Sequence, residues 1–110
     1  MKGTLLRFYM HENHKHGHIL LYEWLLEQAK QAGIHGGSAF RAIAGFGRHG
    51  KLHEQHFFEL AGDLTVQVDF LVSNDDADRL IDLFRRENIH VVFARFEADF
   101  GVINGDETAC

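Results

Sequence analysis

The stretch GFGRHGKLHE, residues 45–54, combines glycines with basic side chains in a way that suits anion binding. Glycines allow backbone N–H groups to approach a ligand closely. Arg48 supplies a planar guanidinium with five donors, and Lys51 supplies a compact positive charge. Together these groups could hold a phosphate. Glycines near two basic residues are equally compatible with an ordinary turn, so the stretch alone leaves both interpretations open.

Histidines form the second chemical feature of the chain, which has nine of them. Four follow one another at short spacings: His11, His14, His16 and His18. Neutral imidazoles bind zinc, copper or nickel, so a divalent-metal site in this stretch is one hypothesis. Residues 11–18 are typical of a polar loop, which gives ligands no preset geometry, and no cysteine lies nearby. A solvated loop that chelates metal only incidentally is the alternative.

The residue types needed for catalysis are poorly placed. Ser38 and Ser73 have no histidine and acid in a recognisable order around them. Cys110 is the last residue, where nothing holds it against a base. The acidic run at residues 75–78 resembles a paired-carboxylate site, but the first turn of a helix explains it. We therefore expect a protein that is not an enzyme.

Length and charge restrict the class of protein further. The chain has 110 residues, 45% of them hydrophobic, and a formal net charge of -5. We expect one domain over residues 1–103 and a flexible tail over residues 104–110. The acidic balance argues against nucleic acid as a partner, and no apolar run is long enough for membrane insertion. The lone cysteine and the lack of a secretory leader favour a cytoplasmic location.

The pattern of apolar residues predicts six elements that would position these groups. Alternation of apolar and polar residues indicates strands, and helical spacing indicates two amphipathic helices. Ser73 is expected to cap the second helix, Asn88 to end it, and Gly33 to end the first. The expected order is strand 4–10, helix 19–32, strand 38–46, strand 64–72, helix 73–88 and strand 90–98. This βαββαβ order predicts an α+β, ferredoxin-like sandwich, with an antiparallel sheet and two helices on one face.

One face of such a sheet carries no helix and needs another partner. Its expected residues include Ile43, Leu71 and Phe93 among polar ones, a mixture that suits packing against other subunits. Trp24 on the first helix is expected in the core or at an interface. Arg41 either pairs with Asp69 across the sheet or contacts a ligand.

Beyond these patterns, the sequence resembles a known family. GFGRHGKLHE is similar to the start of the T-loop of PII signal-transduction proteins, and the wider resemblance is to the PII-like family of unknown function numbered DUF190. It extends over some ninety residues in order, through LRFYM, HG at residues 16–17, LYEWL, AGI, FRAIAGFG, His49, His53 and LAGDLTVQVDFL.

The resemblance implies a homotrimer whose intersubunit clefts bind an adenine nucleotide. It also implies a regulatory role, in which the loop between the second and third strands signals to a partner such as a membrane transporter or channel. Residues implied at the nucleotide are Arg41, Gly45, Phe46, Gly47, Arg48, His49, Lys51, His53 and Arg95. The chain lacks a second glycine- and lysine-rich loop before its last strand, so AMP, ADP or cyclic AMP is favoured over Mg-ATP. The alternative function is a histidine-rich trimer of the cation-tolerance type that binds zinc or another divalent metal.

Overall fold

A computed structural model describes residues 1–46 and 64–105 of the chain. Strand β1 (Lys2–His11) is followed by a small hairpin of β2 (Lys15–His16) and β3 (Ile19–Leu20), and then by helix α1 (Leu21–Gln31). Strands β4 (Ser38–Arg41) and β5 (Thr65–Val72) precede helix α3 (Asn74–Arg86) and strand β6 (Val92–Asp99). Among the described residues, no helix is long and apolar enough to cross a membrane.

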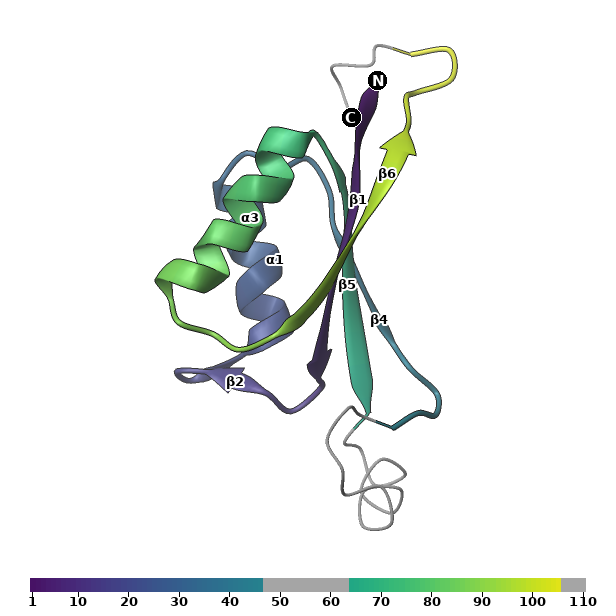
Figure 1. Ribbon diagram of the computed structural model, residues 1–110. Coiled ribbons are helices and arrows are strands. Elements are labelled where there is room, and N and C mark those ends of the chain that lie inside the picture. Colours follow the sequence, from purple (N-terminus) through teal and green to yellow (C-terminus); the bar gives the residue numbers. More distant parts are fainter. Residues whose placement is uncertain (47–63, 106–110) are drawn as a thin grey trace.

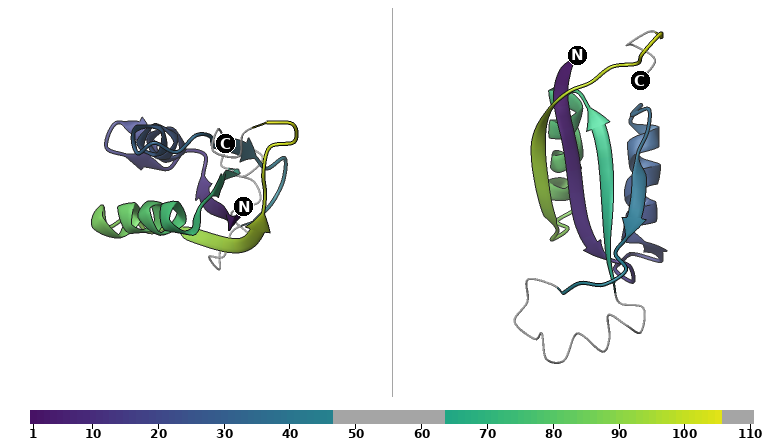
Figure 2. Two further views of the ribbon diagram at one scale, coloured as in Figure 1. Left: turned by 90° about the horizontal axis from the view of Figure 1, so that it is seen from above. Right: turned by 90° about the vertical axis from the view of Figure 1, so that its right-hand side faces the viewer.

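The main sheet has four antiparallel strands in the order β4-β5-β1-β6. Both helices cover one face of this sheet and leave the other face open (Figure 1). Figure 2, in its right-hand view, shows the open face in front and the helices behind it. The predicted ferredoxin-like sandwich is thereby confirmed.

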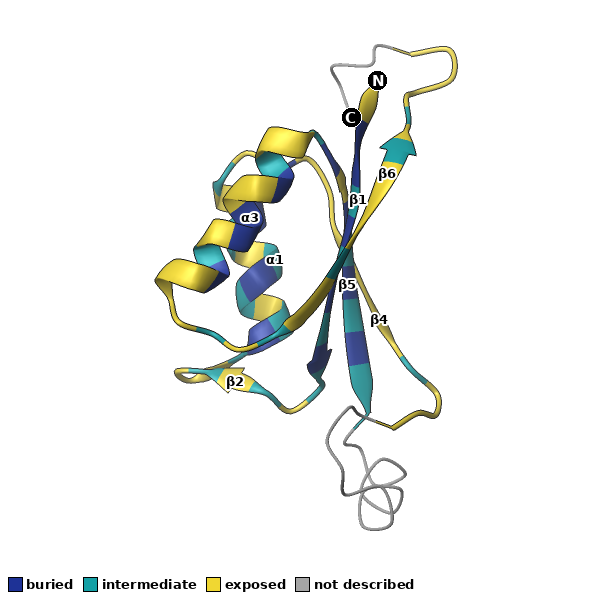
Figure 3. Ribbon diagram, viewed as in Figure 1, coloured by how far each residue is buried: buried dark blue, intermediate teal, exposed yellow. Residues whose placement is uncertain are grey.

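The core lies between the sheet and the two helices. Alternate residues of the central strands point into it, as the sequence pattern predicts, and Figure 3 shows the buried residues of the helices turned toward the sheet. The strands and helices contribute Leu6, Phe8, Met10, Val66, Val68, Phe70, Val72, Leu21, Leu25, Ala29, Ala77, Leu80, Ile81 and Phe84. Phe8 is central, with its ring 4.7 Å from that of Phe84 and 6.3 Å from that of Phe70 between centroids.

Local signals fix the ends of both helices. The Ser73 side chain accepts a hydrogen bond from the backbone N–H of Asp76 at 3.1 Å, which caps the start of α3. Asn88 adopts a positive φ of 55° just after the same helix, and Gly33 adopts 88° just after α1. Both residues are in the left-handed conformation that ends a helix, so the three predicted helix boundaries are confirmed.

Two elements differ from the sequence prediction. The expected strand 38–46 ends at Arg41, because β5 begins at Thr65 and offers no partner beyond that point. Residues 11–18, expected to be an irregular loop, contain strand β2 of the small hairpin, which turns at Gly17 with a φ of 67°. Because Ile19 and Leu20 belong to this hairpin, α1 starts at Leu21.

The open face of the sheet is partly apolar. Leu71 is exposed there as expected. Phe93 is not on this face, because the register pairs it with Phe8 and directs both toward the helices. Phe96, paired with Leu5, takes its place on the open face. Ile43 is almost fully exposed beyond the end of β4.

Candidate functional site

The candidate site begins at the base of the connection between β4 and β5. Gly45 and Phe46 are exposed after the end of β4. Five further candidates, Gly47, Arg48, His49, Lys51 and His53, lie outside the described residues. Their roles stay predictions.

Two backbone hydrogen bonds hold the two ends of this connection, the β4 stem at residues 41–46 and the β5 stem at residues 64–65. Ala42 N–H donates to the carbonyl of Thr65 at 2.8 Å, joining the end of β4 to the start of β5. On the other side, Glu12 N–H donates to the carbonyl of Leu64, also at 2.8 Å. The stems are therefore tied both to each other and to the end of β1.

Arg41 lies on the β4 stem, and its side chain is bound to an acid. Its Nη1 donates to Oε2 of Glu12 at 3.2 Å. The Arg41 side chain is 66% exposed, whereas that of Glu12 is only 12% exposed. The guanidinium therefore remains open to solvent while its counterion is anchored against the protein.

The alternative that Arg41 pairs with Asp69 is wrong. The register places Ser38 opposite Asp69 and Arg41 opposite Val66, so Arg41 and Asp69 point to different faces of the sheet. Asp69 instead accepts two hydrogen bonds from Arg7, at 2.9 Å from Nε and 3.1 Å from Nη2.

The Arg7–Asp69 pair occupies the middle of the open face. Its hydrogen bonds to Asp69 raise the pKa of Arg7, so the guanidinium stays charged. The Arg7 guanidinium lies 5.4 Å from the centre of the Phe96 ring, a cation–π distance. The charges on this part of the face thus satisfy each other.

Arg95 lies far from the β4 stem within one chain. It belongs to β6, and β4 and β6 are the two opposite edge strands of the sheet. Its Nη1 donates to Oδ1 of Asp78 on α3 at 2.7 Å. Arg41, Gly45 and Phe46 are close together in the sequence, at and just after the β4 edge of the sheet. Arg95 lies on the opposite edge, so one chain does not bring all four residues together.

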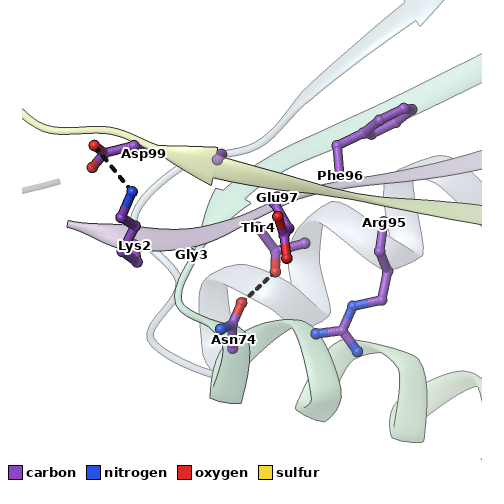
Figure 4. Close-up of a pocket in the computed structure, with 9 residues that line it drawn as sticks. Lys2, Gly3, Thr4, Asn74, Arg95, Phe96, Glu97 and Asp99 are labelled. Atoms are coloured by element: carbon purple, nitrogen blue, oxygen red, sulfur yellow. Dashed lines mark hydrogen bonds and ion pairs between the residues drawn. The ribbon is translucent and has the colours of Figure 1, made fainter.

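Arg95 lines a pocket that the sequence did not indicate (Figure 4). The pocket has a volume of about 740 Å³ and lies between β1, β6 and the start of α3. Its walls are formed by Lys2, Gly3, Thr4, Asn74, Arg95, Phe96, Glu97, Ala98 and Asp99. Apart from Asn74 of α3, these residues meet through the β1–β6 register, a non-local pairing that no motif encodes.

Charges in this pocket are largely balanced within the protein. Lys2 Nζ lies 3.5 Å from Oδ2 of Asp99, and Arg95 is engaged by Asp78 as described. The buried Thr4 hydroxyl donates to Oδ1 of Asn74 at 2.6 Å, which Figure 4 marks as a dashed line. Within one chain, the pocket therefore offers no concentrated positive charge for a phosphate, and Arg95 is free for an anion only when it leaves Asp78.

The four histidines His11, His14, His16 and His18 do not assemble into a metal centre. Across residues 1–46 and 64–105 there is no group of three or more His, Cys, Asp or Glu side chains that could hold a metal ion. His16 Nε2 lies 3.2 Å from Oε1 of Glu87, and its ring lies 4.6 Å from that of Trp24. Burial, followed by the nearby His11 and His16, lowers the pKa of His14. Nothing in this geometry favours the zinc hypothesis.

Trp24 has the structural role expected of it. Its ring meets that of Phe84 edge-on, with centroids 5.9 Å apart, and the residue packs partly buried against the core. Through its contacts with Trp24 of α1 and with Glu87, which follows α3, His16 holds the small hairpin against both helices.

Comparison with known proteins places the chain in a family. The family model DUF190, described as Uncharacterized ACR, matches residues 3–92. The chain belongs to the DUF190 family. The resemblance inferred from its motifs is thereby confirmed. This DUF190 chain is also 29% identical over 101 residues to a UPF0166 protein from Aquifex aeolicus, a match that covers 84% of the chain and 96% of that relative.

Solved structures of PII-like proteins share the fold of this DUF190 chain. One is CPII from Thiomonas intermedia K12 bound to ADP and bicarbonate, with a TM-score of 0.62 and 20% identity over 89% of this chain and 87% of that one. A second structure of CPII, described as a nitrogen regulatory PII-like protein, is bound to ADP, AMP and bicarbonate. It matches with a TM-score of 0.57 and 15% identity over 94% and 99% of the two chains. The fold is therefore that of PII-like proteins.

Proposed function

We propose that this DUF190 protein is a PII-like regulatory protein that binds an adenine nucleotide and acts in the cytoplasm without catalysing a reaction. The observation that carries the proposal is the likeness of fold to CPII, whose solved structures hold ADP, and in two cases AMP as well. The glycine- and arginine-containing stretch at residues 45–54 supplies groups of the type that bind phosphate.

The nucleotide is proposed to lie between subunits of a homotrimer. Arg41 belongs to β4, and Gly45 and Phe46 follow that strand, whereas Arg95 belongs to β6. Because β4 and β6 are opposite edges of one sheet, a site that uses both edges requires two chains. The partly apolar open face, with its internally neutralised ion pair, supports burial against other copies.

Signalling is proposed to pass through the connection between β4 and β5. A ligand shifts the conformation of a segment only through its different affinities for two states. A phosphate bound by Gly47, Arg48 and Lys51 would favour one state and change the surface offered to a partner, such as a membrane transporter or channel. His49 and His53 would lie beside the ligand in the same segment.

AMP, ADP or cyclic AMP is the preferred ligand in this proposal, ahead of Mg-ATP. Residues 87–91 lead directly from α3 into β6 without a glycine- and lysine-rich stretch that could hold further phosphates. With fewer protein groups available to bind phosphates, a nucleotide with one or two phosphates fits the site better than magnesium-bound ATP.

Isothermal titration calorimetry with AMP, ADP, ATP and cyclic AMP tests the proposal. We expect at least one of these nucleotides to bind the wild type and to bind an Arg48→Ala variant more weakly. Arg85→Ala is the matched control, because Arg85 is an exposed arginine paired with Asp82 on α3. Light scattering on the same samples should give the mass of a trimer.

Two outcomes would contradict the proposal. One is a monomer that binds none of the four nucleotides. The other is heat from zinc alone that survives Arg48→Ala and disappears when His14 and His16 are replaced, which would favour the metal-binding alternative.

A further inference from the structure

Glu12 occupies a junction at the base of the candidate site. Its backbone N–H is bonded to Leu64 on the β5 stem, and its carboxylate accepts from Arg41 on the β4 stem. Glu12 is therefore connected to both stems of the connection between β4 and β5, and it stands directly before the small hairpin.

The carboxylate of Glu12 is held in place rather than free to swing into solvent. The side chain is 12% exposed, and the backbone of the same residue is fixed at 2.8 Å to Leu64. Arg41, by contrast, is mostly exposed and is a long side chain with other rotamers available. When the pair separates, Arg41 is the partner that moves.

A phosphate that uses Nη1 of Arg41 competes with Glu12. The Glu12 carboxylate already accepts from Nη1, so carboxylate and phosphate cannot both take this donor with the best geometry. A phosphate also comes close to the Glu12 carboxylate, and like charges repel. The affinity of the site for phosphate is thus reduced by a group of the protein itself.

We propose that Glu12 is a positioning residue that competes with the ligand's phosphate for Arg41 and so sets the affinity for phosphate-bearing ligands. This inference rests on the proposed function for the identity of the ligand as a nucleotide. The competition itself applies to any phosphate or pyrophosphate group that reaches Arg41. A nucleoside without phosphate does not take part in the competition.

The test replaces Glu12 by glutamine, which keeps its shape and backbone but removes the charge. We expect Glu12→Gln to bind ADP and pyrophosphate about two- to fivefold more tightly than the wild type, the range that corresponds to loss of one exposed ion pair. Binding of adenosine should not change. In an Arg41→Gln background, the substitution at Glu12 should have a clearly smaller effect on ADP and pyrophosphate, because only the direct repulsion between Glu12 and the phosphate remains.

A matched control is Asp82→Asn, which removes one negative charge from the exposed Asp82–Arg85 pair on α3. It should leave all three affinities unchanged, and this separates a local effect from a change in net charge. If Glu12→Gln fails to fold, Glu12→Asp keeps the charge but shortens its reach to Arg41, and the same tightening is expected in reduced size.

The result for pyrophosphate separates this inference from the proposed function. The Nε–Hε resonance of Arg41, followed by NMR during titration with pyrophosphate, should shift at a lower concentration in Glu12→Gln than in the wild type. Shifts at equal concentrations in the two proteins overturn the inference, whatever ADP does. A shift at lower pyrophosphate concentration in Glu12→Gln, with no ADP binding in any protein, supports the inference and contradicts the proposed function.

Discussion

Chains that carry different substitutions should restore each other's nucleotide sites when they assemble together. Arg41 and Arg95 lie on opposite edge strands, so a site built from both takes one residue from each of two subunits. We therefore consider two variants, Arg41→Ala and Arg95→Ala, first separately and then in mixed trimers.

The size of each single effect follows from the contacts of Arg95. A hydrogen bond from a charged donor contributes about 1.5–3 kcal/mol. Binding a phosphate first requires Arg95 to leave Asp78, now at 2.7 Å in an exposed pair worth about 0.2–1 kcal/mol. The net contribution is then about 1–2 kcal/mol, and Arg95→Ala should weaken ADP binding about 5- to 30-fold. Arg41→Ala should have a similar effect, because Arg41 has to leave Glu12.

The number of wild-type sites in mixed trimers shows whether the two arginines come from different chains. When equal amounts of the two variant chains assemble at random, about one quarter of the clefts combine an intact Arg41 with an intact Arg95. Calorimetry should therefore detect about 0.25 sites of wild-type affinity per chain. Mixing two differently tagged preparations of Arg95→Ala is the control and should restore none.

Mixed trimers, verified by double-tag purification, that contain no site of wild-type affinity would contradict a site shared between two chains. In that case the two arginines serve the same chain, or one of them does not contact the nucleotide.

Three further predictions concern stability and assembly. Ser73→Ala removes the cap on Asp76 N–H and should lower the free energy of unfolding by about 1 kcal/mol in urea titrations, whereas Ser73→Asn, another good cap, should retain most of it. Leu71→Glu places a charge on the open face and should give monomers in analytical ultracentrifugation with an unchanged circular dichroism spectrum; intact trimers would show that this face is not the interface. Because the pKa of His14 is lowered from 6.5, the unfolded chain binds this proton more readily, so the fold should lose stability as the pH falls below 6.5. In urea titrations at about pH 7.5 and about pH 5.5, His14→Gln should lose less stability over this range than the wild type, and an identical loss would contradict the assignment.

Much of the fold was predictable from local sequence. The alternation in β5 placed Val66, Val68, Phe70 and Val72 in the core, and the register confirms that assignment. Ser73 and Asn88 marked the ends of α3 because capping depends on residues within one turn. Features of this kind need no knowledge of distant partners.

Non-local pairing explains what the sequence did not predict. Arg41 could not be assigned to a face without the β4–β5 register, since a slip of one residue reverses every side chain in a strand. The small hairpin depends on the docking of His16 against Trp24 and Glu87, which come from two different helical regions. The pocket beside Arg95 depends in the same way on how β1 and β6 align.

The positions of Arg41 and Arg95 also bear on how such a protein would respond in a cell. A binding site divided between two copies does not exist until those copies meet, so its abundance follows mass action as the amount of chain rises. At low protein concentration few complete sites would form, so little nucleotide would bind, and bound nucleotide would in turn stabilise the assembly. The amount of nucleotide complex would therefore depend on the concentration of the chain and on that of the nucleotide together.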